Sequence, residues 1–152
     1  ENYLSAGRQD IREKVQYGKL MHEIFSGIIY YDDVKSSVRK KVIEGIIRES
    51  EENEIRSKIE NLLANPDIRK WFEKGIVVLN EAAILMPDSS TRRPDRIILK
   101  DGKATIIDFK FGEEHPHYLN QVRQYKKIIG EMGYEVDGAY LWFVDSDKII
   151  SV

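Results

Sequence analysis

Two aspartates and a lysine interrupt a segment that otherwise has the pattern of a β-hairpin. Asp95 follows a proline at the start of the first predicted strand, and Asp108 interrupts the apolar run of the second. Asp101-Gly102 separates the two runs and predicts a two-residue turn. Counted outward from that turn, Asp95 falls directly opposite Asp108. Their β-carbons would then lie about 4.5–5.5 Å apart, a position where like charges repel.

Two carboxylates at this spacing suit a hard divalent cation such as Mg²⁺ or Mn²⁺. Lys110 lies two residues beyond Asp108, so its side chain leaves the same face of the strand. This face would present two acids and one amine around a metal ion. The alternative is a solvent-facing strand with ordinary charges, and a bulge or a longer loop would also shift the register.

The first half of the chain has the apolar spacing of helices, and the second half changes to the pattern of strands. Helices are predicted over residues 7–29, over 32–63 in two parts, and over 66–75. Strands are predicted over 76–85, 96–99, 104–111, 138–144 and 148–152, with a helix over 117–132. That helix joins 104–111 to 138–144 and makes them parallel neighbours. We therefore expect an α/β fold with a mixed β-sheet flanked by helices and a helical N-terminal half.

Two residues outside the hairpin could extend its chemistry. Glu81 lies in the predicted strand 76–85 and could add a carboxylate, although an exposed glutamate is an equally good interpretation. His22 shares a helix face with Gly18 and Phe25. A histidine on such a face is more often a core residue than a ligand, while Gly18 would let the helix approach a neighbour closely.

The helix predicted over 117–132 carries polar groups on one face. Tyr118, Gln121 and Tyr125 share that face. Tyr125 could contact a ligand, or it could belong to the packing stripe of Val122 and Ile129. The spacing leaves both interpretations open.

Composition sets limits on the class of protein. The chain has 152 residues, of which 41% are hydrophobic and 33% charged, as in a globular domain. Its net charge of -2 gives no global field that would attract nucleic acid, although a local patch still could. The absence of cysteine excludes disulfides, cysteine zinc sites and cysteine nucleophiles, and fits a reducing cytoplasm. No signal peptide and no apolar run of membrane-spanning length is present, so we expect no membrane partner.

Three segments together resemble a known family. "RPDRIILKDGKATIIDFKFG" (93–112) resembles the core motif of the PD-(D/E)xK nucleases, with Pro94-Asp95 followed by Asp108-Phe109-Lys110. "GKLMHEIFSGI" (18–28) resembles the histidine-bearing helix of RecB-type nuclease domains, and "HYLNQVRQYKKII" (117–129) resembles their glutamine-and-tyrosine helix. The three motifs follow the family's order and span most of the chain.

The resemblance implies a restriction-endonuclease-like fold, a metal-dependent DNA nuclease activity and a set of roles. The metal would be bound by His22, Asp95, Asp108 and the main-chain carbonyl of Phe109. Lys110 would position the attacking water and stabilise charge on the phosphate. Gln121 and Tyr125 would support the site or the substrate backbone. Glu81 matches an acidic position that often precedes the PD motif.

The resemblance also implies partners. Such domains usually end long helicase–nuclease chains that process broken DNA. We therefore expect residues 1–152 to form one nuclease domain, a C-terminal fragment of a longer chain, served by a helicase domain of the same or a partner chain. Basic residues that could contact DNA phosphates, or simply be solvated, are Arg92, Arg93 and Arg96, with Arg123, Lys126 and Lys127 on the later helix.

Two other functions stay open at this level. A catalytically inactive nuclease-like module could bind DNA or a partner protein, although the complete set of His22, Asp95, Asp108 and Lys110 argues against it. A restriction-type endonuclease would cut at a defined sequence as a dimer, and the RecB-type helix motifs favour the exonuclease module over it. The iron–sulfur branch of the family needs cysteines, which are absent.

Overall fold

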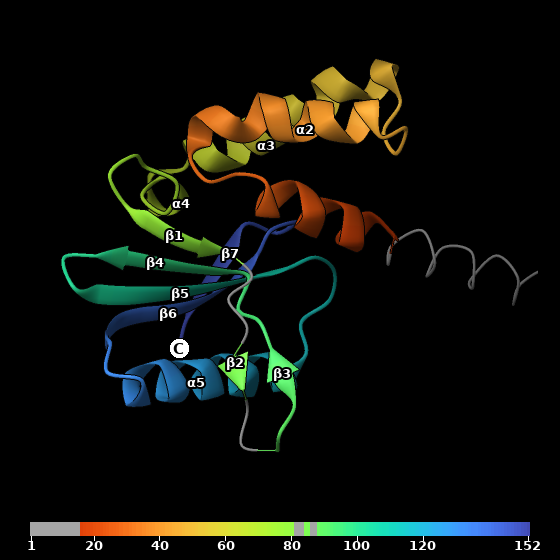
Figure 1. Cartoon of the computed structure of the whole chain (residues 1–152). Helices are drawn as coiled ribbons and strands as arrows, with labels where there is room; N and C mark the ends of the chain where they lie inside the picture. Colours follow the sequence, from red (N-terminus) through yellow and green to blue (C-terminus); the bar gives the residue numbers. More distant parts are fainter. Residues whose placement is uncertain (1–15, 81–83, 86–87) are drawn as a thin grey trace, which may run out of the picture.

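A five-stranded β-sheet forms the centre of the molecule (Figure 1). The computed structural model describes residues 16–80, 84–85 and 88–152. The strands follow the order β1-β4-β5-β6-β7. Their bounds are β1 (Val77–Asn80), β4 (Arg96–Lys100), β5 (Lys103–Lys110), β6 (Glu135–Phe143) and β7 (Lys148–Ser151). β5 and β6 run parallel and the other neighbours are antiparallel, so the predicted mixed sheet is confirmed.

Helices cover both faces of this sheet. Figure 1 shows α2 and α3 above it and α5 (Pro116–Glu131) below it. Residues 16–26 are helical and are called the first helix here. The remaining helices are η1 (Tyr31–Asp33), α2 (Val34–Ile43), η2 (Glu49–Glu51), α3 (Glu52–Ala64) and α4 (Pro66–Arg69). The helical N-terminal half predicted from the sequence is therefore confirmed for the described residues.

β5 separates two hydrophobic cores because successive side chains on a strand point to opposite faces. Ile107 and Phe109 pack in the core shared with the first helix, α2, α3 and α4. Ile106 packs in the other core, between the sheet and α5. Asp108 occupies the α5 face between Ile106 and Lys110. The acid thus stands in a layer that is otherwise apolar, which is where an uncompensated charge is most unfavourable.

The hairpin has the predicted register. Lys100 pairs with Lys103, and Arg96 pairs with Ile107. The turn residues Asp101 and Gly102 have φ of 51° and 76°, as a tight turn between right-twisted strands requires. The predicted parallel pairing of the later strands is also correct, since Asp108 pairs with Leu141 across β5 and β6.

The single strand predicted over 76–85 is wrong. β1 ends at Asn80, which pairs with Arg96, the first residue of β4. The ladder ends there because β4 offers no earlier partner. Ile84 instead starts β2 (Ile84–Leu85), which pairs with β3 (Thr91–Arg92) in a separate sheet and buries Ile84 on the α5 side. The apolar residues before and after Asn80 thus look like one strand in the sequence, but they belong to two different sheets.

Candidate active site

Asp95 and Asp108 meet at the end of the hairpin, opposite the turn. The backbone amide of Asp95 donates to Oδ1 of Asp108 over 3.2 Å, and the amide of Phe109 donates to Oδ2 of Asp95 over 2.7 Å. The Asp95 side chain is 24% exposed and the Asp108 side chain 3%. Each carboxylate is therefore fixed by the main chain beside the other. The sequence predicted this juxtaposition from the turn alone.

The second carboxylate oxygen of Asp108, Oδ2, is the polar atom of the site that is least well compensated. Oδ2 is buried and has no hydrogen-bond partner within the described part of the chain. Lys110 Nζ lies 3.2 Å away, an ion-pair distance without hydrogen-bond geometry. Burial and the negative charge of Asp95 raise the pKa of Asp108 to about 7, although Lys110 opposes the rise. A buried acceptor of this kind is well matched to a cation.

The pKa of Asp95 is shifted in the opposite direction from that of Asp108. Burial alone would raise its pKa, but contacts with His22, with Asp108 and with the Phe109 amide outweigh it, so the pKa of Asp95 is lowered. At mildly acidic pH the two acids consequently hold one proton, on Asp108, and that proton is lost as the pH rises through about 7.

Lys110 connects the acids to α5. Its side chain is 19% exposed. Its Nζ lies 3.4 Å from Gln121 Oε1 and 4.5 Å from the centre of the Tyr118 ring. The ammonium is thus held between a carboxylate, an amide oxygen and an aromatic face, with part of it open to solvent.

Tyr125 lies one turn beyond Gln121 on the same face of α5 and is fully buried. Burial and the charges of Asp108 and Asp95 raise the pKa of Tyr125 to about 12, while the positive charge of Arg92 opposes the rise. Its hydroxyl therefore stays protonated at any physiological pH. The geometry fits a supporting role for Tyr125 rather than proton abstraction.

His22 reaches the acids from the first helix. Its Nδ1 lies 3.4 Å from Oδ1 of Asp95, and its ring meets the edge of Phe111 at a centroid distance of 5.0 Å. The side chain is 36% exposed, so His22 is no core residue. A Cβ built on Gly18 would lie 3.7 Å from Phe111 Cβ, an ordinary contact. The helix therefore approaches Phe111 at Gly18, as expected, but leaves room there for a Cβ.

Arg96 does not serve as a phosphate contact, and that prediction is wrong. Arg96 is 0% exposed. Its guanidinium donates to the carbonyls of Trp71, Ile28 and Ile29, and lies 4.1 Å from the centre of the Phe72 ring. Because Ile28 and Ile29 directly follow the first helix, Arg96 attaches the His22-bearing segment to the strand that begins beside Asp95.

The other predicted DNA contacts are exposed, and Glu81 lies outside the described residues. Arg92 and Arg93 follow each other on the segment that leads to Asp95. On α5 the exposed basic residues make local contacts, such as Lys127 with Glu131 and Lys126 with the carbonyl of Val152. All of them are exposed at the surface.

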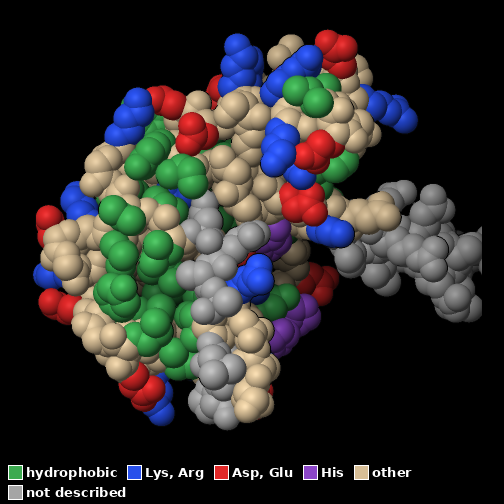
Figure 2. All heavy atoms as spheres, viewed as in Figure 1, with side chains coloured by type: hydrophobic (Ala, Val, Ile, Leu, Met, Phe, Trp, Pro, Cys, Tyr) green, Lys and Arg blue, Asp and Glu red, His purple; other side chains and the backbone are tan. Residues whose placement is uncertain are grey.

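Three aromatic residues near the acids were not identified from the sequence: Phe111, His115 and His117. Phe111 packs against His22, and the two histidines begin α5 next to Tyr118. The signal was present in "FGEEHPHY" (111–118), a dense aromatic run directly after the lysine. In Figure 2 the histidine side chains form purple patches on one side of the molecule, between the first helix and α5.

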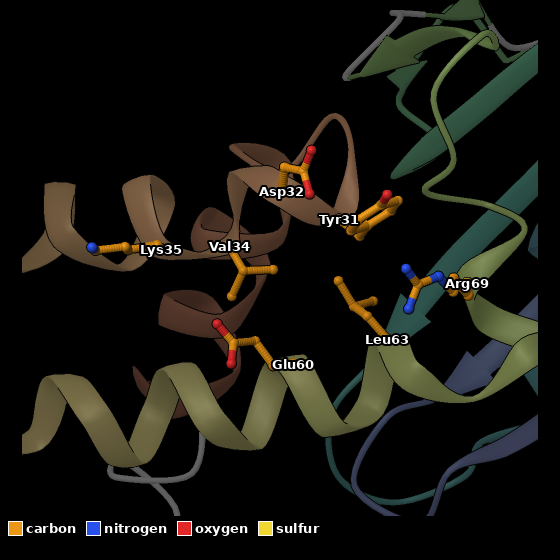
Figure 3. A pocket seen from close by; sticks show the side chains of 7 residues that line it. All are labelled: Tyr31, Asp32, Val34, Lys35, Glu60, Leu63 and Arg69. Carbon is orange, nitrogen blue, oxygen red and sulfur yellow. The ribbon is translucent and has the colours of Figure 1, made fainter.

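A pocket of about 330 Å³ lies elsewhere, between α2 and α3 (Figure 3). It is lined by Tyr31, Asp32, Val34, Lys35, Glu60, Leu63 and Arg69. No predicted site residue belongs to it, and its mixed charges are partly used, since Asp32 pairs with Lys74 and Arg69 covers the Tyr31 ring. It offers no nucleophile or acid–base pair comparable to the Asp95–Asp108 site.

The candidate ligands of a metal ion in this site are His22, Asp95 and Asp108. Across residues 16–80, 84–85 and 88–152, no three histidine, aspartate or glutamate residues form a preassembled metal-binding group. His22, Asp95 and Asp108 nonetheless follow one another in a continuous chain of contacts, and the chain ends in Oδ2 of Asp108, which accepts no hydrogen bond from the described residues. The donor set and this buried oxygen suit a hard divalent cation.

Comparison with known proteins adds no family assignment. No protein-family model matches the chain, and no curated protein matches it significantly. In the described residues no helix has the length and apolar character needed to cross a membrane.

Proposed function

We propose that this chain is a metal-dependent DNA nuclease of the PD-(D/E)xK type, similar to the nuclease domains of RecB-type helicase–nucleases. The observation that carries the proposal is the Asp95–Asp108 pair with Lys110 at 3.2 Å. Burying two acids side by side destabilises a fold unless a ligand compensates for it. That ligand is expected to be a divalent cation, because Asp108 Oδ2 has no hydrogen-bond partner among the described residues and Lys110 is the ion-pair partner found there.

The order of the elements supports the same proposal. The first helix is followed by the antiparallel strands β1, β4 and β5, then by α5, and then by β6 parallel to β5. The acids lie at the end of the hairpin, and α5 brings Gln121 to the lysine. This arrangement agrees with a restriction-endonuclease-like fold that has its site at one end of the central strands.

Asp95, Asp108 and His22 would hold a Mg²⁺ or Mn²⁺ ion, and the main-chain carbonyl of Phe109 is the fourth ligand implied by the family resemblance. When bound, such an ion neutralises phosphate charge and lowers the pKa of a water ligand. Lys110 adds a fixed positive charge where negative charge gathers in the transition state. Gln121 accepts from the lysine and holds it at the edge of the site, 3.4 Å away.

Arg92 and Arg93 carry exposed charge on the segment leading to Asp95 and would contact the DNA backbone. A chain of net charge -2 is a weak general attractor of DNA. We therefore propose that a helicase domain, on the same or a partner chain, delivers the strand to this site. A salt-dependent affinity is expected, since bound phosphates release their counterions.

The proposal is tested by incubating the protein with linear duplex, circular duplex and single-stranded DNA, each with Mg²⁺, Mn²⁺ or EDTA. We expect cleavage that requires the metal and a DNA end. Metal-dependent cutting of circular duplex at fixed positions would favour the restriction-type endonuclease. Binding without cleavage in every metal would favour the inactive module.

A further inference from the structure

The start of α5 presents a cluster of aromatic rings that the proposed chemistry does not use. His115 and His117 are exposed, with their rings stacked at 25° and 5.5 Å between centres. The Tyr118 ring lies 4.4 Å from His117 and 5.3 Å from His115. Three rings thus form one connected group at the surface. They are called the ring cluster below.

The ring cluster adjoins the candidate active site directly. Lys110 Nζ lies 4.5 Å from the centre of the Tyr118 ring, and it is the same amine that stands 3.2 Å from Asp108. A strand whose phosphate is bound between Lys110 and the acids would therefore pass its neighbouring nucleotide over Tyr118 and the histidines. The Lys110 side chain therefore contacts both the acids and the ring cluster.

Core packing accounts for only one of these rings. Tyr118 is half-buried and packs against the core on the α5 side, with the Phe143 ring at 6.4 Å between ring centres, whereas the two histidines are exposed to solvent. Proteins that bind single-stranded DNA stack unpaired nucleobases on exposed aromatic side chains beside positive charge. Every base has a π-face, so such binding needs no particular sequence.

Charge near the ring cluster is compatible with DNA. Glu114, the nearest acid in the sequence to His115, pairs with Lys148 at 2.8 Å. Lys110 supplies a positive group beneath Tyr118. Figure 2 shows both basic and acidic side chains close to the histidines on this side of the molecule.

We propose that the ring cluster binds an unpaired base of the DNA strand that enters the site, next to the phosphate held by Lys110. The inference rests on the proposed nuclease function and names its substrate class, a single-stranded DNA end. Stacking of one base on aromatic side chains changes affinity by a factor of about 5 to about 150. A fully paired duplex keeps its bases stacked on one another and gains none of this.

The test is a thermodynamic cycle between base and ring, performed in EDTA so that DNA is not cut. Short single-stranded oligonucleotides, intact or with one abasic position moved along the strand, are titrated against wild type and His117→Ala. At one position we expect the abasic change to weaken wild-type binding about tenfold, and His117→Ala to weaken binding of the intact strand to a similar degree. The two losses should not add. His117→Phe should retain most of the affinity, because the stacking face is kept.

Tyr134→Ala is the matched control, since Tyr134 is an exposed aromatic residue beyond the opposite end of α5. It should bind every oligonucleotide as wild type does. Should His117→Ala fail to fold, 2-aminopurine placed at the sensitive position of the strand gives the answer with wild type alone. With abasic positions on both sides, so that neighbouring bases do not already quench it, its fluorescence falls if the base stacks on the protein. Additive losses, equal weakening of intact and abasic strands, or unquenched 2-aminopurine would each overturn the inference.

This outcome is separable from that of the nuclease proposal. Wild-type cleavage with no coupling between base and ring would reject the ring cluster and leave the nuclease standing. Coupling in a protein that cleaves nothing in any metal would reject the nuclease and keep the binding site for unpaired bases. No measurable affinity for any DNA would reject both.

Discussion

The backbone amide of Asp95 donates to Oδ1 of Asp108 across 3.2 Å, which ties the two acids together through the main chain. This link holds the carboxyl groups side by side in the folded state even though their charges repel. The second oxygen of Asp108 is left without a hydrogen-bond partner among the described residues and lies 3.2 Å from Lys110 Nζ. Stability, metal affinity and cleavage should therefore all respond to this pair.

Asp108→Asn should stabilise the metal-free protein at alkaline pH. The folded-state pKa of Asp108 is raised to about 7, above its unfolded value of about 3.9. Its stabilising contribution is therefore complete below about pH 4 and is lost as the pH rises to about 7. Wild type should melt on the order of 5 °C lower at pH 8 than at pH 5, and the variant should lose less.

Thermal melts in EDTA across this pH range test that prediction. The lowered pKa of Asp95 acts in the opposite direction, but below about pH 4, so it does not mask the effect. Asp101→Asn, in the exposed hairpin turn, is the control, because asparagine adopts positive φ as readily as aspartate. A wild type that gains stability between pH 5 and pH 8 would show that the pair is not strained.

Lys110→Ala should lose turnover by a factor of about 10² or more, since the ammonium acts on developing charge. Metal affinity should be compared at pH 8 or above, because loss of Lys110 removes the charge that keeps the Asp108 pKa from rising further. Calorimetric titration with Mn²⁺ should then give nearly the wild-type affinity. Lys103→Ala, at the other end of β5, is the control. If Lys110→Ala abolished metal binding at high pH, the lysine would have been assigned the wrong role.

His22→Ala should weaken the metal without unfolding the domain. Mn²⁺ at about one hundred times its dissociation constant stabilises a folded protein by about 2.7 kcal/mol. The melting temperature of wild type should rise accordingly, and that of His22→Ala should rise less at the same concentration. The metal-free melting temperatures should agree, since the side chain is 36% exposed. Lys19→Ala on the same helix should behave as wild type. A lower metal-free melting temperature with an unchanged response to Mn²⁺ would make His22 a structural residue.

Arg96→Lys should destabilise the fold on the order of 3 kcal/mol, because lysine cannot satisfy the three carbonyls that Arg96 binds. In a chain of this size that corresponds to a melting temperature lower by about 10 °C. The exposed Arg92→Lys is the comparison. If Arg96→Lys left the melting temperature unchanged and weakened DNA binding, Arg96 would be a phosphate contact and not a structural residue.

Turn chemistry explains why the centre of the site was predictable. Asp101-Gly102 fixes the hairpin register, and the register alone places Asp95 opposite Asp108. The parallel pairing of β5 with β6 followed from the helix between them. Both inferences use local rules that tertiary packing did not override.

The errors arose where burial depends on distant segments. Arg96 begins the run "RIIL" and looks exposed in sequence, but the carbonyls of Ile28 and Trp71 that it binds are far away along the chain. Residues 76–85 do not form one strand, because β4 begins at Arg96 and therefore has no residue that could pair with β1 beyond Asn80. Neither the length of a partner strand nor an unsatisfied carbonyl in another segment is visible in a local pattern.

The most direct test of the account compares cleavage of linear DNA by wild type, Asp95→Asn and Asp108→Asn, purified alike and assayed with Mn²⁺ at pH 8. Asp101→Asn serves as the folded control. We predict that wild type and Asp101→Asn degrade the DNA, that EDTA stops both, and that the two site variants remain folded but are inactive. Cleavage by Asp108→Asn at the wild-type rate would contradict the assignment of the Asp95–Asp108 pair as the catalytic centre.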